Sequence, residues 1–380
     1  MMLSSLRPLK PPLKPPLKPL ADPSVRRIGI VRLRVGLGDL LATVPALRAL
    51  RAARPDAEVV MITWSEMAAV VARMAPYVDE LLPFPGYEGI PDRPVDKHAS
   101  PSFFRRAQSL KLDLALQMYG GQRAANEVTE RLGARLTGGF YTPGMWPARP
   151  STHLRYPRRS HEIHRHLELM RFLGVPSGSD RMEFPLRPQD AEEREALLRR
   201  FRLRPKGYVC LHPGSKSTSR RWPPERFAGV ADALAAEGWQ VALVGTPSER
   251  SLAASVARQT STAVADLCGR TTLGGLGAVL SSSALLIGND SGPSHLATAL
   301  QVPSVTIFMA GDPQRWAALD RTLHRVVHAG VSCRPCGLLE CPIDLRCGWR
   351  VSAGTVLSEA RDLLSSATSL HPRSGPTEVA

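Results

Sequence analysis

One segment in the second half of the chain combines three features that together restrict the fold. Residues 284–287 are a short apolar stretch of the length of a buried strand, and residues 296–300 have a composition that favours a helix. The residues between them, 289–295, are small and polar. A strand, a small polar turn and a helix direct free backbone N–H groups and the helix dipole toward an anion. The segment predicts an α/β domain with a phosphate-binding turn, although an ordinary helix cap fits the same pattern.

The same alternation of strand and helix patterns occurs in both halves of the chain. Strands are predicted at residues 28–33, 59–63 and 112–118, and again at 208–212, 240–244, 284–287 and 304–308. After the first strand, Leu40, Leu41, Val44, Leu47 and Leu50 recur at helical spacing. We therefore expect an α/β protein with two Rossmann-like, doubly wound domains that face each other across a cleft.

Length and composition place the boundaries of these domains. A chain of 380 residues is too long for one compact core. Proline and lysine repeats indicate an extended, disordered basic tail at the N-terminus. The predicted division is a tail at 1–25, an N-terminal domain at 26–185, a linker at 186–206, a C-terminal domain at 207–365 and a flexible tail at 366–380.

The net charge of +15 indicates an anionic partner: nucleic acid, an acidic membrane face or a phosphorylated substrate. Nucleic-acid binding is disfavoured because aromatic residues make up only 6% of the chain and no stacking motif occurs. The chain contains no run of about 18 apolar residues and no secretory signal, so we expect a cytoplasmic protein.

Polar turns follow three further predicted strands, at the edge where open α/β sheets bind ligands. Residues 36–39 form a glycine-containing turn that ends in Asp39, whose carboxylate suits either a helix cap or a cleft. Residues 212–223 combine hydroxyls with three cations, a composition that suits phosphate, although it also suits a solvated loop. Glu249 follows a later strand and suits either a ribose contact or a helix cap.

The order of these turns resembles one family. Gly38-Asp39, then 213–215 with 220–223, then Gly245 with Glu249, then 290–296 is similar to the ADP-heptose:lipopolysaccharide heptosyltransferases of glycosyltransferase family 9. The resemblance covers about residues 26–364, and the block at 290–296 is its most specific part. One position departs from it, because Arg220 stands where the family often carries lysine.

The resemblance implies a GT-B fold, with the acceptor in the N-terminal domain and the nucleotide sugar in the C-terminal one. It implies an inverting transferase that needs no metal or other cofactor and uses Asp39 to deprotonate the acceptor hydroxyl. Asp290 and His295 would shape the sugar pocket, and Glu249 would hold the ribose. The diphosphate and sugar would be held by Ser215, Arg220, Arg221, Ser291 and Gly292. The adenine would be lined by Leu267, Gly269 and Thr271.

On this reading the partners are ADP-heptose and a phosphorylated glycolipid acceptor of the lipopolysaccharide core, with no nucleic acid. The enzyme would work at the anionic inner face of the inner membrane as a peripheral protein. Two enzymatic alternatives stay open: a family 9-like transferase that uses another nucleotide sugar or acceptor, and a GT-B nucleotide-sugar epimerase with further acid and base groups.

Two clusters resemble metal ligand sets. The thiols of Cys333, Cys336, Cys341 and Cys347 lie within 15 residues, so a structural zinc or iron–sulfur site, free thiols and a disulfide are all compatible with the sequence. The run 161–166 contains three histidines, but we interpret it as a solvated helix face. Cys210 and Cys268 are predicted to be packing residues.

Overall fold

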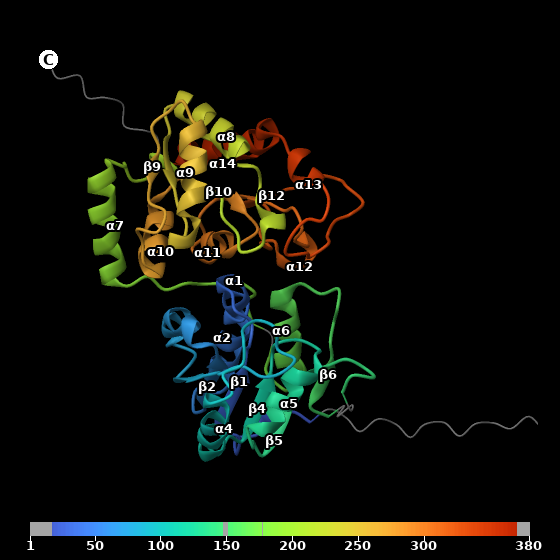
Figure 1. Ribbon diagram of the computed structural model, residues 1–380. Helices are drawn as coiled ribbons and strands as arrows, with labels where there is room; N and C mark the ends of the chain where they lie inside the picture. Colours follow the sequence, from blue (N-terminus) through green and yellow to red (C-terminus); the bar gives the residue numbers. More distant parts are fainter. Residues whose placement is uncertain (1–16, 147–150, 177, 371–380) are drawn as a thin grey trace, which may run out of the picture.

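The computed structural model describes residues 17–146, 151–176 and 178–370, and in it two α/β domains lie one above the other (Figure 1). Each domain is built on a six-stranded parallel sheet. The first sheet has the order β3-β2-β1-β4-β5-β6, and the second has the order β12-β11-β10-β7-β8-β9. The prediction of two Rossmann-like, doubly wound domains is therefore confirmed.

The N-terminal domain holds the first sheet, whose central strands are buried on both faces. Its strands are β1 Arg27–Val31, β2 Glu58–Thr63, β3 Glu80–Pro83, β4 Leu114–Gln117, β5 Leu136–Tyr141 and β6 His153–Arg155. Its α-helices are α1 Leu37–Leu41, α2 Val44–Ala53, α3 Ala68–Val71, α4 Ala99–Ser109, α5 Arg123–Arg131 and α6 Glu162–Phe172. Apolar clusters pack on each side of this sheet, as burial on both faces requires.

The C-terminal domain repeats the arrangement. Its strands are β7 Tyr208–His212, β8 Gln240–Leu243, β9 Ala265–Asp266, β10 Leu285–Asn289, β11 Ser304–Ile307 and β12 His324–Val327. Its α-helices are α7 Pro188–Phe201, α8 Pro224–Ala236, α9 Arg250–Gln259, α10 Leu273–Ser282, α11 Gly292–Ala299, α12 Pro313–Trp316, α13 Arg346–Trp349 and α14 Ala353–Leu370. Short 3₁₀ turns lie at Pro19–Ala21, Ser65–Met67, Ala72–Met74, Thr218–Arg220 and Pro247–Glu249.

Where the structure describes the two predicted tails, it corrects them. Leu20 and Val25 are buried in the first domain, and the Arg54 guanidinium donates to the carbonyl of Val25 at 2.5 Å, so residues 17–25 are no detached tail. At the other end, α14 continues to Leu370, beyond the predicted boundary at residue 365. Residues 1–16 and 371–380 lie outside the described part of the chain.

The predicted linker also differs, because most of it is helix α7. A capping box between Arg187 and Asp190 begins this helix, and Arg202 in the left-handed conformation ends it. The helix packs beside α10, where the Thr272 N–H donates to Glu193 at 2.7 Å (Figure 1). At its start, Arg73 of the first domain donates to Asp190 at 2.8 Å. The segment therefore belongs to the second domain and is tied to the first by an ion pair.

Among the described residues, none of the helices is both long enough and apolar enough to cross a bilayer.

Candidate active site

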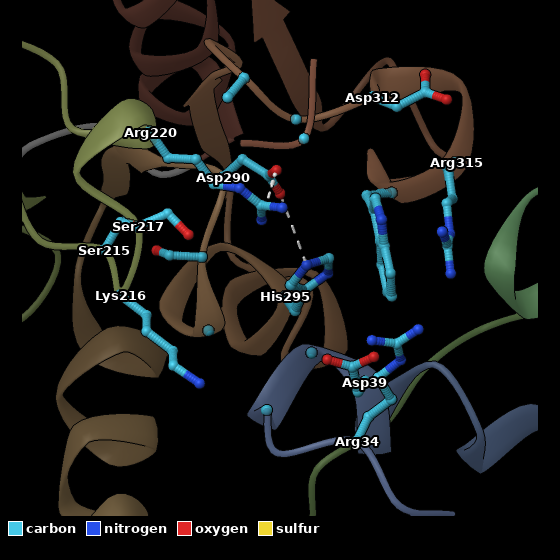
Figure 2. A pocket seen from close by; sticks show the side chains of 18 of the residues that line it. Arg34, Asp39, Ser215, Lys216, Ser217, Arg220, Asp290, His295, Asp312 and Arg315 are labelled. Atoms are coloured by element: carbon cyan, nitrogen blue, oxygen red, sulfur yellow. Dashed lines mark hydrogen bonds and ion pairs between the residues drawn. The ribbon is translucent and has the colours of Figure 1, made fainter. Parts of the chain in front are cut away.

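A cavity of about 620 Å³ lies between the two domains, at the carboxyl ends of their strands. The first domain contributes the turn after β1, together with Asp92 and Arg158. The second contributes the turns after β7 and β10 and the start of α12 (Figure 2). Parallel sheets bind ligands at this edge, so two facing edges form one cleft with two different walls. The predicted cleft between the domains is confirmed.

Asp39 lies on the wall formed by the first domain. It belongs to the short helix α1, which begins directly after the extended residue Gly36. Its carboxyl group is about one-fifth exposed and faces the cleft (Figure 2). Burial raises the pKa of Asp39, and the guanidinium of Arg32 opposes this effect only in part. A carboxylate with a raised pKa at the edge of a cleft can accept a proton from a substrate.

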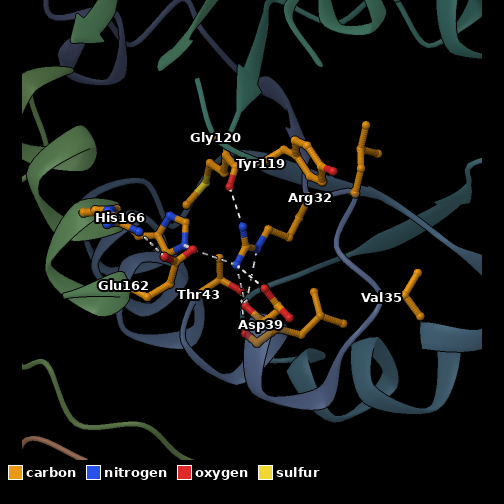
Figure 3. A network of polar contacts seen from close by, with 12 residues as sticks. Arg32, Val35, Asp39, Thr43, Tyr119, Gly120, Glu162 and His166 are labelled. Atoms are coloured by element: carbon orange, nitrogen blue, oxygen red, sulfur yellow. Dashed lines mark hydrogen bonds and ion pairs between the residues drawn. The ribbon is translucent and has the colours of Figure 1, made fainter. Parts of the chain in front are cut away.

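Arg32 is the buried residue that holds Asp39 in place (Figure 3). Its Nη2 atom donates to the backbone carbonyl of Asp39 at 3.0 Å and lies 3.3 Å from Oδ1 of the same residue. Its Nη1 atom donates to the carbonyl of Met118 at 2.8 Å. The guanidinium therefore fixes both the backbone and the side chain of Asp39 against the end of β4.

On the opposite wall, Asn289 joins the turns that follow β7 and β10. Its amide nitrogen donates to the carbonyl of Pro213 at 2.8 Å, and its amide oxygen accepts from the N–H of the buried Trp222 at 3.0 Å. This arrangement fixes the loop that carries Ser215 and Arg220 beside the turn that carries Asp290. All three of these residues line the cleft.

Asp290 is buried, and its carboxylate accepts from Arg220 at 3.2 Å. Its other oxygen lies 3.9 Å from Nε2 of His295. Burial raises the pKa of Asp290 and lowers the pKa of His295, so the imidazole is neutral near pH 7. Asp290 therefore orients two groups that line the cleft.

The start of α11 also faces the cleft. Ser291 is its N-cap residue and forms a capping box with Ser294. The Ser291 hydroxyl lies 3.1 Å from Nδ1 of His212. A helix start of this kind, beside Lys216 and Arg220, provides a positive site for an anion.

Seven of the twelve predicted site residues line the cleft: Asp39, Ser215, Arg220, Asp290, Ser291, Gly292 and His295. The other five do not line it. Arg221 donates to the carbonyl of Ser215 at 2.8 Å, so it supports the loop from behind. Leu267 is fully buried, and its side chain belongs to the apolar core.

Glu249 and Gly269 lie beyond the Ser215 loop, near the ends of β8 and β9. Glu249 accepts from the Thr246 N–H at 2.8 Å and lies 3.4 Å from Nε2 of His212. Burial opposes these contacts, but His212 and Thr246 together lower the pKa of Glu249 to about 2. The Gly269 N–H donates to the carbonyl of Gly245 at 2.8 Å. Thr271 is partly exposed in the next turn.

The cleft also contains charged residues that we did not predict. Arg34, Asp92, Arg158, Asp312 and Arg315 all line it. Arg34 stands two residues before the glycine turn, so its position in the sequence was a usable signal. Arg315 lies on the four-residue helix α12 and Asp312 is its N-cap residue; the segment has no recognisable motif, and only the folded structure brings both residues to the cleft.

The structure also tests the predictions for the cysteine and histidine clusters. Among the described residues, no group of three or more His, Cys, Asp or Glu side chains could hold a metal ion, and all six cysteines are free. Cys210 and Cys268 are buried in the core, as predicted. The interpretation of residues 161–166 as a solvated face is wrong, because His164 alone in this run is exposed. Glu162, Ile163, Arg165 and His166 are buried, and Glu162 and His166 face the Arg32 network (Figure 3).

Comparisons with known proteins identify this architecture. The pattern of glycosyltransferase family 9 (heptosyltransferase) matches residues 103–345. The chain is 27% identical over 292 residues to lipopolysaccharide heptosyltransferase 3 of Escherichia coli K12, which covers 73% of this chain and 81% of that protein. It is 31% identical over 131 residues to lipopolysaccharide heptosyltransferase 1 of Pseudomonas aeruginosa, covering 34% of this chain and 35% of that protein.

Solved structures agree with the fold. A family 9 glycosyltransferase of Veillonella parvula superposes with a TM-score of 0.72 at 22% identity, over 90% of this chain and 97% of that one. The ADP-heptose lipopolysaccharide heptosyltransferase II of E. coli superposes with a TM-score of 0.69 at 18% identity, over 90% and 99%. These likenesses confirm the GT-B fold. The protein is a glycosyltransferase, and it belongs to glycosyltransferase family 9.

Proposed function

We propose that this enzyme transfers heptose from ADP-heptose to a phosphorylated acceptor of the lipopolysaccharide core, by an inverting and metal-independent reaction. The observation that carries the proposal is the position of Asp39, which faces the cation-bearing turns of the second domain across one cleft. Several relatives are named as lipopolysaccharide or lipooligosaccharide heptosyltransferases, which supports this choice of sugar and acceptor. A solved relative, the E. coli heptosyltransferase WaaC, was determined with ADP and with ADP-2-deoxy-2-fluoro heptose.

The proposed reaction is a single displacement. Asp39 accepts the proton of the acceptor hydroxyl, and the hydroxyl oxygen forms a bond to the anomeric carbon of the donor. The bond from that carbon to the diphosphate oxygen breaks, and its electron pair leaves with ADP. Attack from the face opposite the leaving group inverts the anomeric centre.

The leaving diphosphate needs its charge neutralised. Lys216 and Arg220 line the cleft beside the start of α11, and Arg315 lines it from α12. Fixed cations and a helix N-terminus stabilise charge that develops on a leaving phosphate. This composition supports a reaction in which side chains do the work that a divalent cation does elsewhere. Glu249 and the Gly245–Gly269 contact lie beyond the loop and suit the ribose and the adenine.

A second cavity supports an anionic acceptor. It has a volume of about 670 Å³, and Arg155, Arg158 and Arg159 line it. Arg158 also lines the main cleft, so the two cavities adjoin on the side of Asp39. The buried Arg165 donates to the carbonyls of Pro157 and Arg158, at 2.9 and 2.8 Å, and fixes this basic segment. Phosphates of a core glycolipid suit such a surface.

The proposal also places the enzyme in the cytoplasm, bound peripherally to the anionic inner face of the inner membrane. The net charge of +15 favours such binding. Sedimentation with vesicles that contain anionic lipid, compared with neutral vesicles, tests this part.

Calorimetric titration with ADP, UDP, GDP and ADP-heptose, with and without EDTA, tests the donor. Selective binding of ADP and ADP-heptose that EDTA does not change is the expected result. Preference for UDP or GDP would assign another nucleotide sugar. A transfer assay with ADP-heptose and heptose-deficient lipopolysaccharide then tests the acceptor, and NMR of the product tests inversion. Exchange of solvent deuterium into the donor without acceptor would favour an epimerase.

A further inference from the structure

Glu162 stands at the first position of α6 and is almost fully buried, with a side-chain exposure of 3%. Three arginines donate to its carboxylate. Arg32 approaches Oε1 at 3.1 Å, and Arg165 approaches Oε2 at 2.5 Å. Arg315 approaches Oε2 from the other domain, with its Nε and Nη2 atoms each at 2.9 Å. A carboxylate buried this deeply persists only where such partners compensate for its lost hydration.

One of these partners also holds the proposed catalytic base. The Nη2 atom of Arg32 lies between two carboxylates, 3.1 Å from Glu162 and 3.3 Å from Asp39 (Figure 3). Of the other guanidinium nitrogens of Arg32, Nη1 donates to the carbonyl of Met118 and Nε to the carbonyl of Asp39. The two carboxylates therefore share one cation. Glu162 sets where Arg32 lies and how much of its charge Asp39 experiences.

The contact between Arg315 and Glu162 joins the two domains. Next to it, the carbonyl of Ala317 lies 2.9 Å from Nε2 of His161, the N-cap residue of α6. On the same short helix, Trp316 stacks under Arg315 at 4.8 Å and packs against His295 at 5.9 Å. Helix α12 thus contacts Glu162 through Arg315 and contacts His295, in the wall of the donor site, through Trp316.

We propose that Glu162 is a positioning residue that couples the approach of the two domains to the placement and basicity of Asp39. When α12 docks on the start of α6, Arg315 fixes Glu162, Glu162 fixes Arg32, and Arg32 fixes the base. This series of contacts from Arg315 to Asp39 is complete only when the two domains are in contact. This inference rests on the proposed role of Asp39 and adds to it a residue that touches no substrate.

The sign of the electrostatic coupling follows from the groups that face each carboxylate. Asp39 is faced by the positive Arg32 and Arg34, by His295, and by the negative Glu162 and Asp290. Burial raises the pKa of Asp39, and the charge of Glu162 raises it further.

Glu162 itself is faced by Arg32, Arg165, Arg315, His166 and His161. Burial alone would raise the pKa of Glu162, but His166 and the guanidiniums of Arg32 and Arg315 outweigh it and hold that pKa well below its usual value. Burial also lowers the pKa of His161 and of His166 to about 4, so both imidazoles are neutral near pH 7. Glu162 is therefore charged throughout the working range.

Two substitutions test the coupling in opposite directions. Glu162→Gln keeps the shape of the side chain and removes its charge, so the pKa of Asp39 falls. The acid limb of the pH profile, where kcat/KM is lost as Asp39 takes up a proton, therefore moves to lower pH by about half a unit. Arg315→Met removes one of the three cations that compensate Glu162, so its negative charge acts more strongly on Asp39 and the limb moves to higher pH. In both variants kcat falls about tenfold or more. In Glu162→Gln the Kd for ADP changes less than about threefold, because Glu162 does not line the cleft. Rescue by Arg315→Lys is partial, because lysine restores charge but not the paired contact.

Because Glu162→Gln leaves two buried arginines, Arg32 and Arg165, without their charged partner, its thermal unfolding is measured beside its activity. If it does not fold, Arg315→Met at the rim of the cleft still tests the proposal. A merely structural role would lower Tm and kcat while both acid limbs stay at the wild-type pH, and that result overturns the coupling. Additive effects in the double variant overturn it as well. Wild-type protein that transfers no sugar would instead contradict the proposed function.

Discussion

Gly38 and His295 belong to different domains, and no side chain fits between them. A Cβ atom at position 38 would overlap the imidazole ring of His295. Gly38 precedes Asp39, and His295 lies beside Asp290. The wall that carries the proposed base and the wall that carries the proposed sugar site therefore pack closely together at Gly38 and His295.

We predict that Gly38→Ala lowers kcat/KM about tenfold or more without unfolding the protein. The added methyl group pushes His295 and the second domain away, and small displacements of reacting groups cost large factors in rate. Steady-state kinetics and thermal unfolding measure the two effects. Gly229→Ala is the control, because Gly229 lies in helix α8 and open space surrounds a Cβ there. Unchanged kinetics in Gly38→Ala would contradict close approach during the reaction.

We predict that Asp39→Asn lowers kcat about 10²- to 10⁴-fold, the usual contribution of a general base, while the Kd for the donor stays within a few fold. Asparagine keeps the size of the side chain but cannot accept the proton. Transfer assays and calorimetry with ADP-heptose measure the two quantities. Retained turnover would show that another residue is the base.

The pH dependence of kcat/KM follows from the direction of the pKa shift at Asp39. The base acts only when deprotonated, so activity is present above its pKa and is lost as the pH falls through it. Because burial raises the pKa of Asp39, the loss begins at a higher pH than the ordinary value of about 3.9 would give. A profile at saturating donor and varied acceptor measures the limb. Full activity down to pH 4 would contradict the shift.

Asp290→Ala is expected to raise the Kd for ADP-heptose about tenfold or more, because it frees Arg220 and His295 from the carboxylate that orients them. The control is Asp232→Ala on the outer helix α8, where the carboxylate accepts only from backbone N–H groups at 261 and 262. Unchanged donor affinity in Asp290→Ala would count against the sugar pocket.

Glu249 gives a prediction about the pH dependence of stability. Its pKa of about 2 in the folded protein lies below the unfolded value of 4.5. The depressed pKa means that its carboxylate stabilises the fold above pH 4.5 and that this contribution is lost as the pH falls toward 2. Glu249→Gln should therefore unfold more easily than wild type at pH 7 and equally easily near pH 2. Chemical denaturation at both pH values measures this difference, and the same deficit at both would contradict it.

The acceptor surface is tested by Arg158→Ala combined with Arg159→Ala. The acceptor KM should rise about tenfold, because two cations that suit a phosphate are lost, and the donor KM should not change. Arg105→Ala combined with Arg106→Ala is the control with the same change of charge, because both arginines are exposed on α4. An equal effect of the control would assign the change to net charge alone.

The sequence predicted the central strands well because burial on both faces makes them continuous apolar runs. Of the seven predicted strands, 208–212 has the observed bounds, and the others differ by one or two residues at one or both ends. The strands β3, β5, β6, β9 and β12 escaped prediction. They are short, or lie toward the edges of their sheets, so their sequences lack that signal.

The site was predictable where it stands on a turn directly after a strand, as Asp39 and Asp290 do. Arg158 and Arg315 line one cleft, and Glu162 meets Arg315, only because the two domains come together. No local pattern encodes that docking. The histidines near Glu162 suggested a surface helix, and the burial of this segment depends on arginines far away in the chain.

The separation of the two walls has a consequence for how this enzyme could be altered. Because the proposed base and acceptor surface stand on one domain and the donor turns on the other, exchanging a whole domain with a relative should exchange one substrate preference at a time. Such a hybrid would need to keep the pairs that join the domains: Arg73 with Asp190, Gly38 with His295, and Glu162 with Arg315. These six positions lie at the interface between the domains, so they limit which domains can be exchanged.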